Sequence, residues 1–253
     1  MPIMDIEIPI VSNQLDQDQE FILLDQGEKK LKIKLHDYRI IFSVPRLYEK
    51  IVYEILECAS PKVVTRLLKE EVSKASQNIS DLTVLDLGAG NGIVGEELIN
   101  IGVDEVIGVD IIKEAKEAAF RDRPEVYTDY IVDDLALPHE DTHKILADRS
   151  IDCVICVAAI GYGDIPPRTL ANAINYVDER GWIALSVKED FLKESDNSGV
   201  GDLYKELVQK EVVDIKKKMN YVHRKSISGK KLKYDAIIAR KNTDIPHQIL
   251  KNL

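Results

Sequence analysis

Apolar segments alternate with amphipathic segments between residues 82 and 188, and this alternation constrains the fold more than any other feature of the chain. The apolar segments are rich in Val, Ile and Leu, and they occupy 82–87, 105–110, 127–132, 150–158 and 181–188. The amphipathic segments between them lie at about 92–101, 112–121, 139–148 and 167–179. Apolar strands joined by helices are typical of a parallel sheet covered on both faces. We therefore predict a doubly wound, mostly parallel α/β sheet.

A hairpin is predicted near the C-terminal end of the chain. The segments MNYVHRKSI (219–227) and KLKYDAIIAR (231–240) are separated by a turn at Ser228-Gly229. A glycine-containing turn between two strand-like segments is typical of an antiparallel hairpin. We expect this hairpin to close one edge of the sheet, which then has seven strands.

The first eighty residues differ in pattern from the rest. In the segment 20–35 a glycine turn is followed by strict alternation of apolar residues and lysines, which predicts a β-hairpin with one face in water. Two helices are expected next, one starting near Pro45 and one capped by Ser60. We divide the chain into an N-terminal hairpin-plus-helices appendage, 1–80, and a main domain, 81–253, and expect the appendage to form a lid.

The segment VLDLGAGNGIVGEEL (84–98) follows the first strand of the main domain and matches two different motifs. From Gly90 it has the spacing G-x-G-x-x-G, with the acid Asp110 twenty residues further on, as in dinucleotide-binding proteins. From Asp86 it has the spacing D-x-G-x-G-x-G. The two matches imply ligands of opposite charge, so the chemistry of the loop has to decide between them.

The acid before the glycines favours a cationic ligand. A dinucleotide places its pyrophosphate at the N-terminus of the first helix, where the carboxylate of Asp86 would repel it. A sulfonium or ammonium group is attracted to the same carboxylate. Gly88, Gly90 and Gly92 remove side chains that would keep the backbone away from the ligand. We therefore predict a cationic cofactor against Asp86.

The segment VLDLGAGNG resembles motif I of the class I S-adenosylmethionine-dependent methyltransferases. By this resemblance Asp110 corresponds to the acid that binds the ribose hydroxyls, and Ile111 to an apolar wall for the adenine. YIVDDLALP resembles the segment after the family's third strand, where Asp133 corresponds to the acid that accepts from the adenine amino group. Asp134 and Leu135 then correspond to contacts with the ring edge. The resemblance implies S-adenosylmethionine as the cofactor and a Rossmann-like sheet.

The resemblance extends over residues 82–190 in its motifs and over 191–241 in its pattern of elements. Within the superfamily, LGAGNGIVGEEL, IGVDI and VAAIGYGDIPPRTL are most similar to small methyltransferase-like proteins of the Williams–Beuren-region type. Each acid also has a purely structural interpretation. Asp110 could cap the helix that follows it, and Asp133 or Asp134 could cap a turn.

Candidate residues for the acceptor site come from two parts of the chain. The loop VAAIGYGDIPP (157–167) follows the fourth strand and offers Tyr162 and Asp164. This loop lacks the Asn/Asp-Pro-Pro-Tyr tetrad with which related enzymes hold planar amides or the amino groups of bases. The lid offers five further polar groups in an apolar setting, and of these His36 could act as a base or be structural. The five are His36, Asp37, Tyr38, Tyr48 and Glu49.

A second motif match lies at His139–His143, where HEDTH has the spelling of a zinc-protease helix. The segment follows a proline in a polar stretch, without the apolar periodicity of a buried helix. We therefore predict no metal site.

Cys153 and Cys156 have C-x-x-C spacing. They lie in a predicted strand, where residues three apart point to opposite faces. We therefore predict that both are core residues.

Composition limits the location and the partners of the protein. The net charge of −10 disfavours a broad nucleic-acid-binding face. The longest apolar run, CVICVAAIG, is too short to cross a bilayer, and the N-terminal residues have no basic region like that of a signal peptide. We expect a cytoplasmic protein with a small-molecule substrate, no nucleic-acid partner and no membrane association. The sequence predicts neither the oligomeric state nor the acceptor atom.

Three functions follow as hypotheses. The leading one is a methyltransferase that transfers a methyl group by in-line displacement to a small molecule. The second is a non-catalytic regulatory module that keeps the cofactor pocket. The third, based on the motif at Gly90, is an NAD-dependent oxidoreductase.

Overall fold

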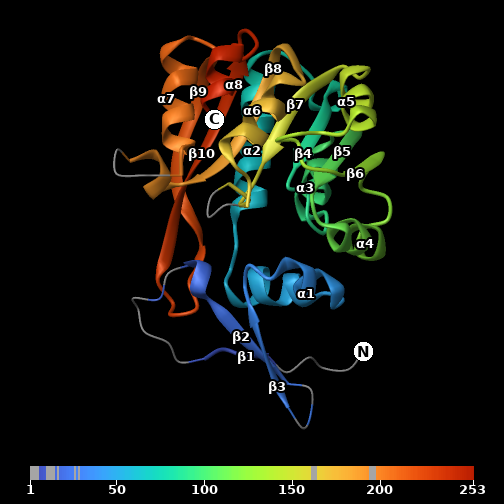
Figure 1. Cartoon of the computed structure of the whole chain (residues 1–253), viewed down its shortest axis with the longest axis vertical. Helices are drawn as coiled ribbons and strands as arrows, with labels where there is room; N and C mark the ends of the chain where they lie inside the picture. The colour runs from blue at the N-terminus through green and yellow to red at the C-terminus, as the bar shows by residue number, and fades with distance from the viewer. Residues whose placement is uncertain are drawn as a thin grey trace.

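The computed structural model describes residues 6–9, 15, 17–25, 27, 29–160, 164–193 and 198–253. A seven-stranded sheet runs through the upper part of the molecule, as seen in Figure 1, with the strand order β6-β5-β4-β7-β8-β10-β9. Its strands are β4 (Thr83–Leu87), β5 (Glu105–Asp110), β6 (Asp129–Val132), β7 (Ile151–Cys156), β8 (Val177–Lys188), β9 (Val213–Lys225) and β10 (Lys231–Lys241). The strands β4 to β8 pair in parallel, whereas β10 is antiparallel to both β8 and β9. The predicted sheet and its terminal hairpin are confirmed.

Helices cover both faces of this sheet. They are α2 (Ser60–Lys74), α3 (Ile93–Ile101), α4 (Lys113–Asp122), α5 (Glu140–Ala147), α6 (Pro167–Asn175), α7 (Val200–Gln209) and α8 (His247–Asn252). One buried cluster contains residues of α2, α3 and α4, and the other contains residues of α5, α6, α7 and α8. Cys153 belongs to the first cluster and Cys156 to the second, and both are fully buried free thiols. The prediction that they face opposite sides of the sheet as core residues is confirmed.

The N-terminal part forms a second, smaller sheet with its own core. It contains β1 (Ile6–Glu7), β2 (Phe21–Asp25) and β3 (Lys30–Lys34), and the predicted hairpin is the antiparallel pair β2–β3. Helix α1 (Tyr38–Ser43) and a π-helix (Glu49–Ile55) follow, and Figure 1 shows α1 between the small sheet and the large one. Most buried apolar residues of this part form one cluster with Ile227, which lies at the turn between β9 and β10, whereas Phe42 packs against Ala115 and Ala118 of α4.

The helix predicted from Pro45 has a different form in the structure. The chain is already helical at Tyr38–Ser43, leaves the helix at Val44 (φ −98°, ψ 117°), and turns helical again as the π-helix Glu49–Ile55. The break has a simple cause, because a proline disfavours helical geometry in the residue before it and has no N–H to donate. The strand β1 and helix α8 were not predicted.

Helix α2 packs with the large sheet. Its residues Val64, Leu68 and Val72 are fully buried in the same cluster as Val84 of β4. The division of the chain at residue 80 stays a prediction, but the packing of α2 associates this helix with the main domain. None of the helices in the described ranges is long and apolar enough to cross a membrane.

Two short 3-10 helices, Ile79–Asp81 and Glu189–Leu192, lie next to strands of the large sheet, and a third, Gln17–Gln19, precedes β2. Beside this third helix, a buried ion pair joins the small sheet to the hairpin of the large one. The guanidinium of Arg224 donates to Oε2 of Glu20 at 2.6 Å, and the backbone N–H of Ile227 donates to Oε1 at 2.6 Å. Figure 1 shows β9 and β10 extending toward the small sheet. The lid is thus anchored at one end to the long terminal hairpin.

Candidate functional site

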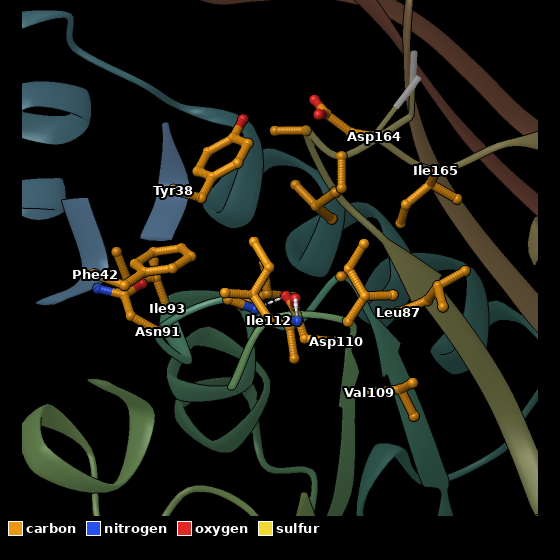
Figure 2. A pocket seen from close by; sticks show the side chains of 18 of the residues that line it. Tyr38, Phe42, Leu87, Asn91, Ile93, Val109, Asp110, Ile112, Asp164 and Ile165 are labelled. Carbon is orange, nitrogen blue, oxygen red and sulfur yellow. Dashed lines mark hydrogen bonds between the residues drawn. The ribbon is translucent and has the colours of Figure 1, made fainter. Parts of the chain in front are cut away.

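A cavity of about 300 Å³ lies at the carboxyl ends of β4, β5 and β7, and the N-terminal lid forms one of its walls. Figure 2 shows Leu87, Asp110 and Ile112 on the sheet side and Tyr38 and Phe42 on the lid side. The position fits the rule that open α/β sheets bind ligands beyond the carboxyl ends of their strands. We take this cavity as the candidate site.

The glycine loop after β4 forms the floor of the cavity, and its backbone requires glycine. Gly88, Gly90 and Gly92 have φ values of +72°, +54° and +89°, in the region that other residues rarely adopt. A Cβ at Gly90 would lie 3.2 Å from Cζ of Phe42 in the lid. Gly88 and Gly90 line the cavity, whereas Gly92 caps α3 and faces Tyr127.

Asp110, at the end of β5, both lines the cavity and organises the loop. Its Oδ2 accepts from the backbone N–H of Gly90 at 2.9 Å, and its Oδ1 accepts from that of Ile112 at 2.9 Å. Burial raises the pKa of this carboxyl, although the backbone hydrogen bonds oppose the rise. These backbone contacts and a ligand-binding role are compatible, because each carboxylate oxygen can accept a second hydrogen bond. Ile111 is 56% exposed and lines the mouth of the cavity.

Asp86 lies beneath the glycine loop. Its side chain is fully buried and is not among the described residues that line the cavity. The hydroxyl of Tyr127 donates to Oδ2 at 2.8 Å, and Oδ1 is buried with no partner in the described part of the chain. Burial raises the pKa of Asp86 to about 7, against the opposing effect of the Tyr127 hydrogen bond. The sequence predicts a cation directly against this carboxylate, whereas the structure shows the carboxylate buried outside the cavity lining.

The acids after β6 line the cavity, but both also stabilise local structure. Asp133 accepts from the backbone N–H of His139 at 2.9 Å and bonds to Nδ1 of the same residue at 2.7 Å. Burial alone would raise the pKa of Asp133, but hydrogen bonds from Thr142 and His139 lower it. Asp134 accepts from the backbone N–H of Ala136 at 2.8 Å, and Leu135 is fully buried at the cavity wall. The capping role that was the alternative interpretation is present for both acids.

The lid contributes a row of aromatic rings to the cavity. Tyr38 and Phe42 are stacked with ring centroids 5.8 Å apart, Phe42 and Tyr48 are 5.3 Å apart, and Tyr48 and Tyr53 are 6.1 Å apart. All four line the cavity. Tyr38 and Tyr48 were predicted from the sequence as acceptor-site candidates, whereas Phe42 and Tyr53 were not. The spacing of Tyr38 and Phe42, four residues apart and so on one helical face, was the available signal.

The structure brings two of the predicted acceptor residues together. Nδ1 of His36 in the lid lies 3.2 Å from Oδ2 of Asp164 in the loop after β7. The carboxyl of Asp164 lines the cavity, and Figure 2 shows the hydroxyl end of Tyr38 on the same side. Tyr162 lies outside the described residues. Ala158, in the same loop, lines the cavity with φ +59°, an uncommon value for a residue with a Cβ.

A second set of contacts joins the lid to the glycine loop, and the sequence analysis did not identify it. Oε1 of Glu49 in the π-helix accepts from Nδ2 of Asn91 at 3.0 Å and from Nη1 of Arg123 at 2.9 Å. The same Arg123 donates to the carbonyl of Asn91 at 3.1 Å and to Glu96 at 2.9 Å. The lid is therefore held at its two ends, by this cluster and by the Arg224–Glu20 pair.

The two histidines of the HEDTH segment have separate partners. His139 bonds to Asp133, whereas Nδ1 of His143 lies 2.8 Å from the hydroxyl of Tyr176. In the described ranges, no three His, Cys, Asp or Glu side chains are grouped as metal ligands.

A doubly wound sheet with a glycine turn after β4 and acids ending the next two strands defines a cofactor-binding α/β protein. The family model described as "Methyltransferase domain" matches residues 61–233. The chain belongs to this family. The match begins at α2, in agreement with the packing of that helix on the large sheet.

The chain is 29% identical over 117 residues to the mitochondrial ubiquinone biosynthesis O-methyltransferase of Candida albicans. That stretch is 46% of this chain and 35% of the relative, so the chain spans about a third of that protein's length. The narrower resemblance to Williams–Beuren-region proteins stays a prediction.

Solved structures share the fold at low sequence identity. An N-methyltransferase from Bradyrhizobium japonicum WM9, in complex with S-adenosyl-L-homocysteine, has a TM-score of 0.55 at 10% identity, over 82% of this chain and 97% of the other. An S-adenosylmethionine-dependent methyltransferase from Clostridium acetobutylicum ATCC 824 has a TM-score of 0.53 at 12% identity, over 78% and 97%. Magnesium protoporphyrin IX methyltransferase from Synechocystis PCC 6803, with bound SAM, has a TM-score of 0.50 at 16% identity, over 72% and 79%.

Proposed function

We propose that the protein is an S-adenosylmethionine-dependent methyltransferase acting on a small molecule. The observation that carries the proposal is that one cavity is lined both by the glycine loop with Asp110 and by the aromatic residues of the lid. The end of the cavity at the glycine loop fits an adenosyl cofactor, and the end at the aromatic residues of the lid is available to an acceptor. Membership of the methyltransferase domain family supports the same activity.

The residues around the glycine loop fit the cofactor. Asp110 has free lone pairs for the ribose hydroxyls, and Ile111 and Leu135 offer apolar surface to the adenine. Asp133 and Asp134 line the same cavity, and in this proposal they contact the adenine, although their present hydrogen bonds cap local structure. When bound, S-adenosylmethionine supplies a methyl group on a cationic sulfonium. The donor is already activated, so the protein mainly provides alignment and exclusion of water.

We assign Asp86 a supporting role. Its carboxylate holds Tyr127 beneath the loop, and the hydroxyl of Tyr130 donates to the carbonyl of Gly90 at 2.7 Å. A positive charge above the loop would favour the ionised form of Asp86 through space, with no need for direct contact. We propose that the attraction predicted from the sequence acts across the loop, without direct contact between Asp86 and the cofactor.

The acceptor end contains a group able to receive a proton. Asp164 lines the cavity, and Nδ1 of His36 lies within hydrogen-bond distance of its carboxylate. A proton taken from an acceptor can therefore be shared by the two side chains. The volume of the cavity, about 300 Å³, favours a small acceptor, and the net charge of −10 disfavours polynucleotides. The cytoplasmic location stays a prediction.

The proposal is tested by titrating the protein calorimetrically with S-adenosylhomocysteine and, separately, with NADH. We expect binding of the first and none of the second. Replacing Asp110 by Ala should weaken binding of S-adenosylhomocysteine by about tenfold or more. Asp104→Ala, at an exposed position before β5, is the matched control. If the protein binds NADH and does not bind S-adenosylhomocysteine, the cavity is a dinucleotide site.

A further inference from the structure

The charged side chains that line the cavity all have the same sign. Among the described lining residues they are Asp110, Asp133, Asp134 and Asp164, with no Lys, Arg or His between them. The part of the loop that the structure does not describe, residues 161–163, contains only glycine and tyrosine. A cofactor with a net charge of about +1 leaves an excess of negative charge in this space. A second cation is therefore electrostatically favoured beside the cofactor.

Two arginines that join the lid to the rest of the protein are each already paired with a carboxylate. Arg224 is bound to the buried carboxylate of Glu20, and Arg123 to Glu49 and Glu96. His36 lies against Asp164 on the lid side, with its Nδ1 3.2 Å from Oδ2, and is not among the described residues that line the cavity. Asp164, whose side chain is 30% exposed, is the acid of the set that faces the lid.

The wall opposite this acid is aromatic. Tyr38, Phe42, Tyr48 and Tyr53 form a continuous row, and burial raises the pKa of the three tyrosines, so their hydroxyls stay protonated. Aromatic rings attract a cation through the negative faces of their π systems, most strongly where water is excluded. A carboxylate beside an aromatic wall is the combination that recognises an ammonium group attached to an apolar body.

We infer, on the basis of the proposed function, that the acceptor is an amine bound as its ammonium between Asp164 and the aromatic row of the lid. A phenol fits this site less well, since its oxygen must first become an anion beside the carboxylate of Asp164. A carboxylate or phosphate acceptor is repelled from the start. An amine, in contrast, is attracted before the reaction and needs no anionic form.

The transfer balances in charge and in protons. The ammonium gives one proton to the Asp164–His36 pair, and the lone pair so freed forms the new N–C bond. The electrons of the broken C–S bond return to sulfur, which becomes a neutral thioether. The methylated nitrogen then carries the positive charge at the place where Asp164 and the aromatic faces stabilise it.

Three probes with one carbon skeleton test the inference by binding alone. They are phenethylamine, 2-phenylethanol and phenylacetate, which carry cationic, neutral and anionic heads. Each is titrated calorimetrically into the protein saturated with S-adenosylhomocysteine. We expect the amine to bind about tenfold or more tightly than the alcohol, and the acid to bind most weakly. Equal affinities, a preference for the alcohol or the acid, or no measurable binding of the amine would each overturn the inference.

A variant locates the preference in the structure. In Asp164→Asn we expect the advantage of the amine over the alcohol to fall below about threefold while the affinity for S-adenosylhomocysteine is unchanged. Asp202→Asn, at a side chain that is 82% exposed, is the control and should keep the preference. An Asp164→Asn protein that still prefers the amine would contradict the assignment. If the unmodified protein does not bind S-adenosylhomocysteine, the proposed function itself is wrong. Failure of the proposed function and failure of the inference about the amine are therefore distinguishable.

Discussion

The hydroxyl of Tyr127 donates a 2.8 Å hydrogen bond to the carboxyl of Asp86, which is fully buried below the glycine loop. This carboxyl has its pKa raised by burial from 3.8 to about 7. The folded protein therefore binds this proton more tightly than the unfolded chain does. The stability that Asp86 contributes is fully present below the unfolded pKa and is lost as the pH rises through the folded one.

We predict that Asp86 makes the free energy of unfolding fall between about pH 4 and about pH 7, by on the order of 4 kcal/mol. The isosteric change Asp86→Asn removes the titrating group and should remove this part of the pH dependence. Denaturation with urea at several pH values, on both proteins and on the exposed control Asp202→Asn, measures the difference. Parallel pH profiles for Asp86→Asn and the unmodified protein would show that Asp86 stays ionised.

Gly90 tests the contact between the loop and the lid. We predict that Gly90→Ala weakens the binding of S-adenosylhomocysteine by about tenfold or more and costs about 1 kcal/mol or more of stability. The reason is twofold, since φ is +54° and the new Cβ would lie 3.2 Å from Phe42, which is itself buried. Calorimetric titration and thermal unfolding measure the two effects.

The matched control for this change is Gly229→Ala in the terminal hairpin. Gly229 has φ +85°, but a Cβ there would meet no atom within 4 Å. The control shares the backbone strain and lacks the contact with the lid, so it should lower stability and leave ligand affinity unchanged. If both variants bind the ligand as the unmodified protein does, the fit of the lid against the loop is not important for binding.

The limits of β5 and the alternation of the large sheet could be predicted, because they depend on local patterns. Strand β5 has the predicted bounds Glu105–Asp110, with a charged residue at each end. The π-helix was not predicted, because its sequence has ordinary helical periodicity and only the proline before it marks the break.

The site was predicted in its parts but not in its arrangement. Strand β4 is buried on both faces, so its pattern could not show on which side Asp86 lies, and its partner Tyr127 is 41 residues away. The contact between His36 and Asp164 spans 128 residues and exists only because the lid packs on the sheet. Such contacts depend on tertiary structure, and periodicity carries no information about them.

Glu49 is predicted to keep the lid closed over the cavity. Its ion pair with Arg123 is mostly buried, with side-chain exposures of 13% and 10%, so Glu49→Gln removes a charge-assisted bond while it keeps the size of the side chain. We expect faster hydrogen–deuterium exchange in residues 38–56 and dissociation of S-adenosylhomocysteine faster by about fivefold or more. Glu54→Gln, whose partner Lys50 is exposed, is the control. Unchanged exchange in this segment of Glu49→Gln would mean that other contacts hold the lid.

The Glu20–Arg224 pair is predicted to contribute more to stability than any exposed pair of the lid. Both side chains are nearly fully buried, at 2% and 7% exposure, and Glu20 also accepts from the backbone of Ile227. Glu20→Gln leaves the guanidinium without its counter-charge, which should cost about 3–5 kcal/mol in chemical denaturation.

The double variant Glu20→Leu/Arg224→Leu removes both charges and should lose less stability than Glu20→Gln, because neither charge is then buried alone. Glu57→Gln removes the partner of Lys225 at the exposed surface, where side-chain exposures are 60% and 40%, and should change stability little. A Glu20→Gln protein as stable as Glu57→Gln would show that water reaches Arg224 when its partner is gone. The lid would then be anchored by the apolar cluster around Ile227, and the ion pair would serve only to orient it.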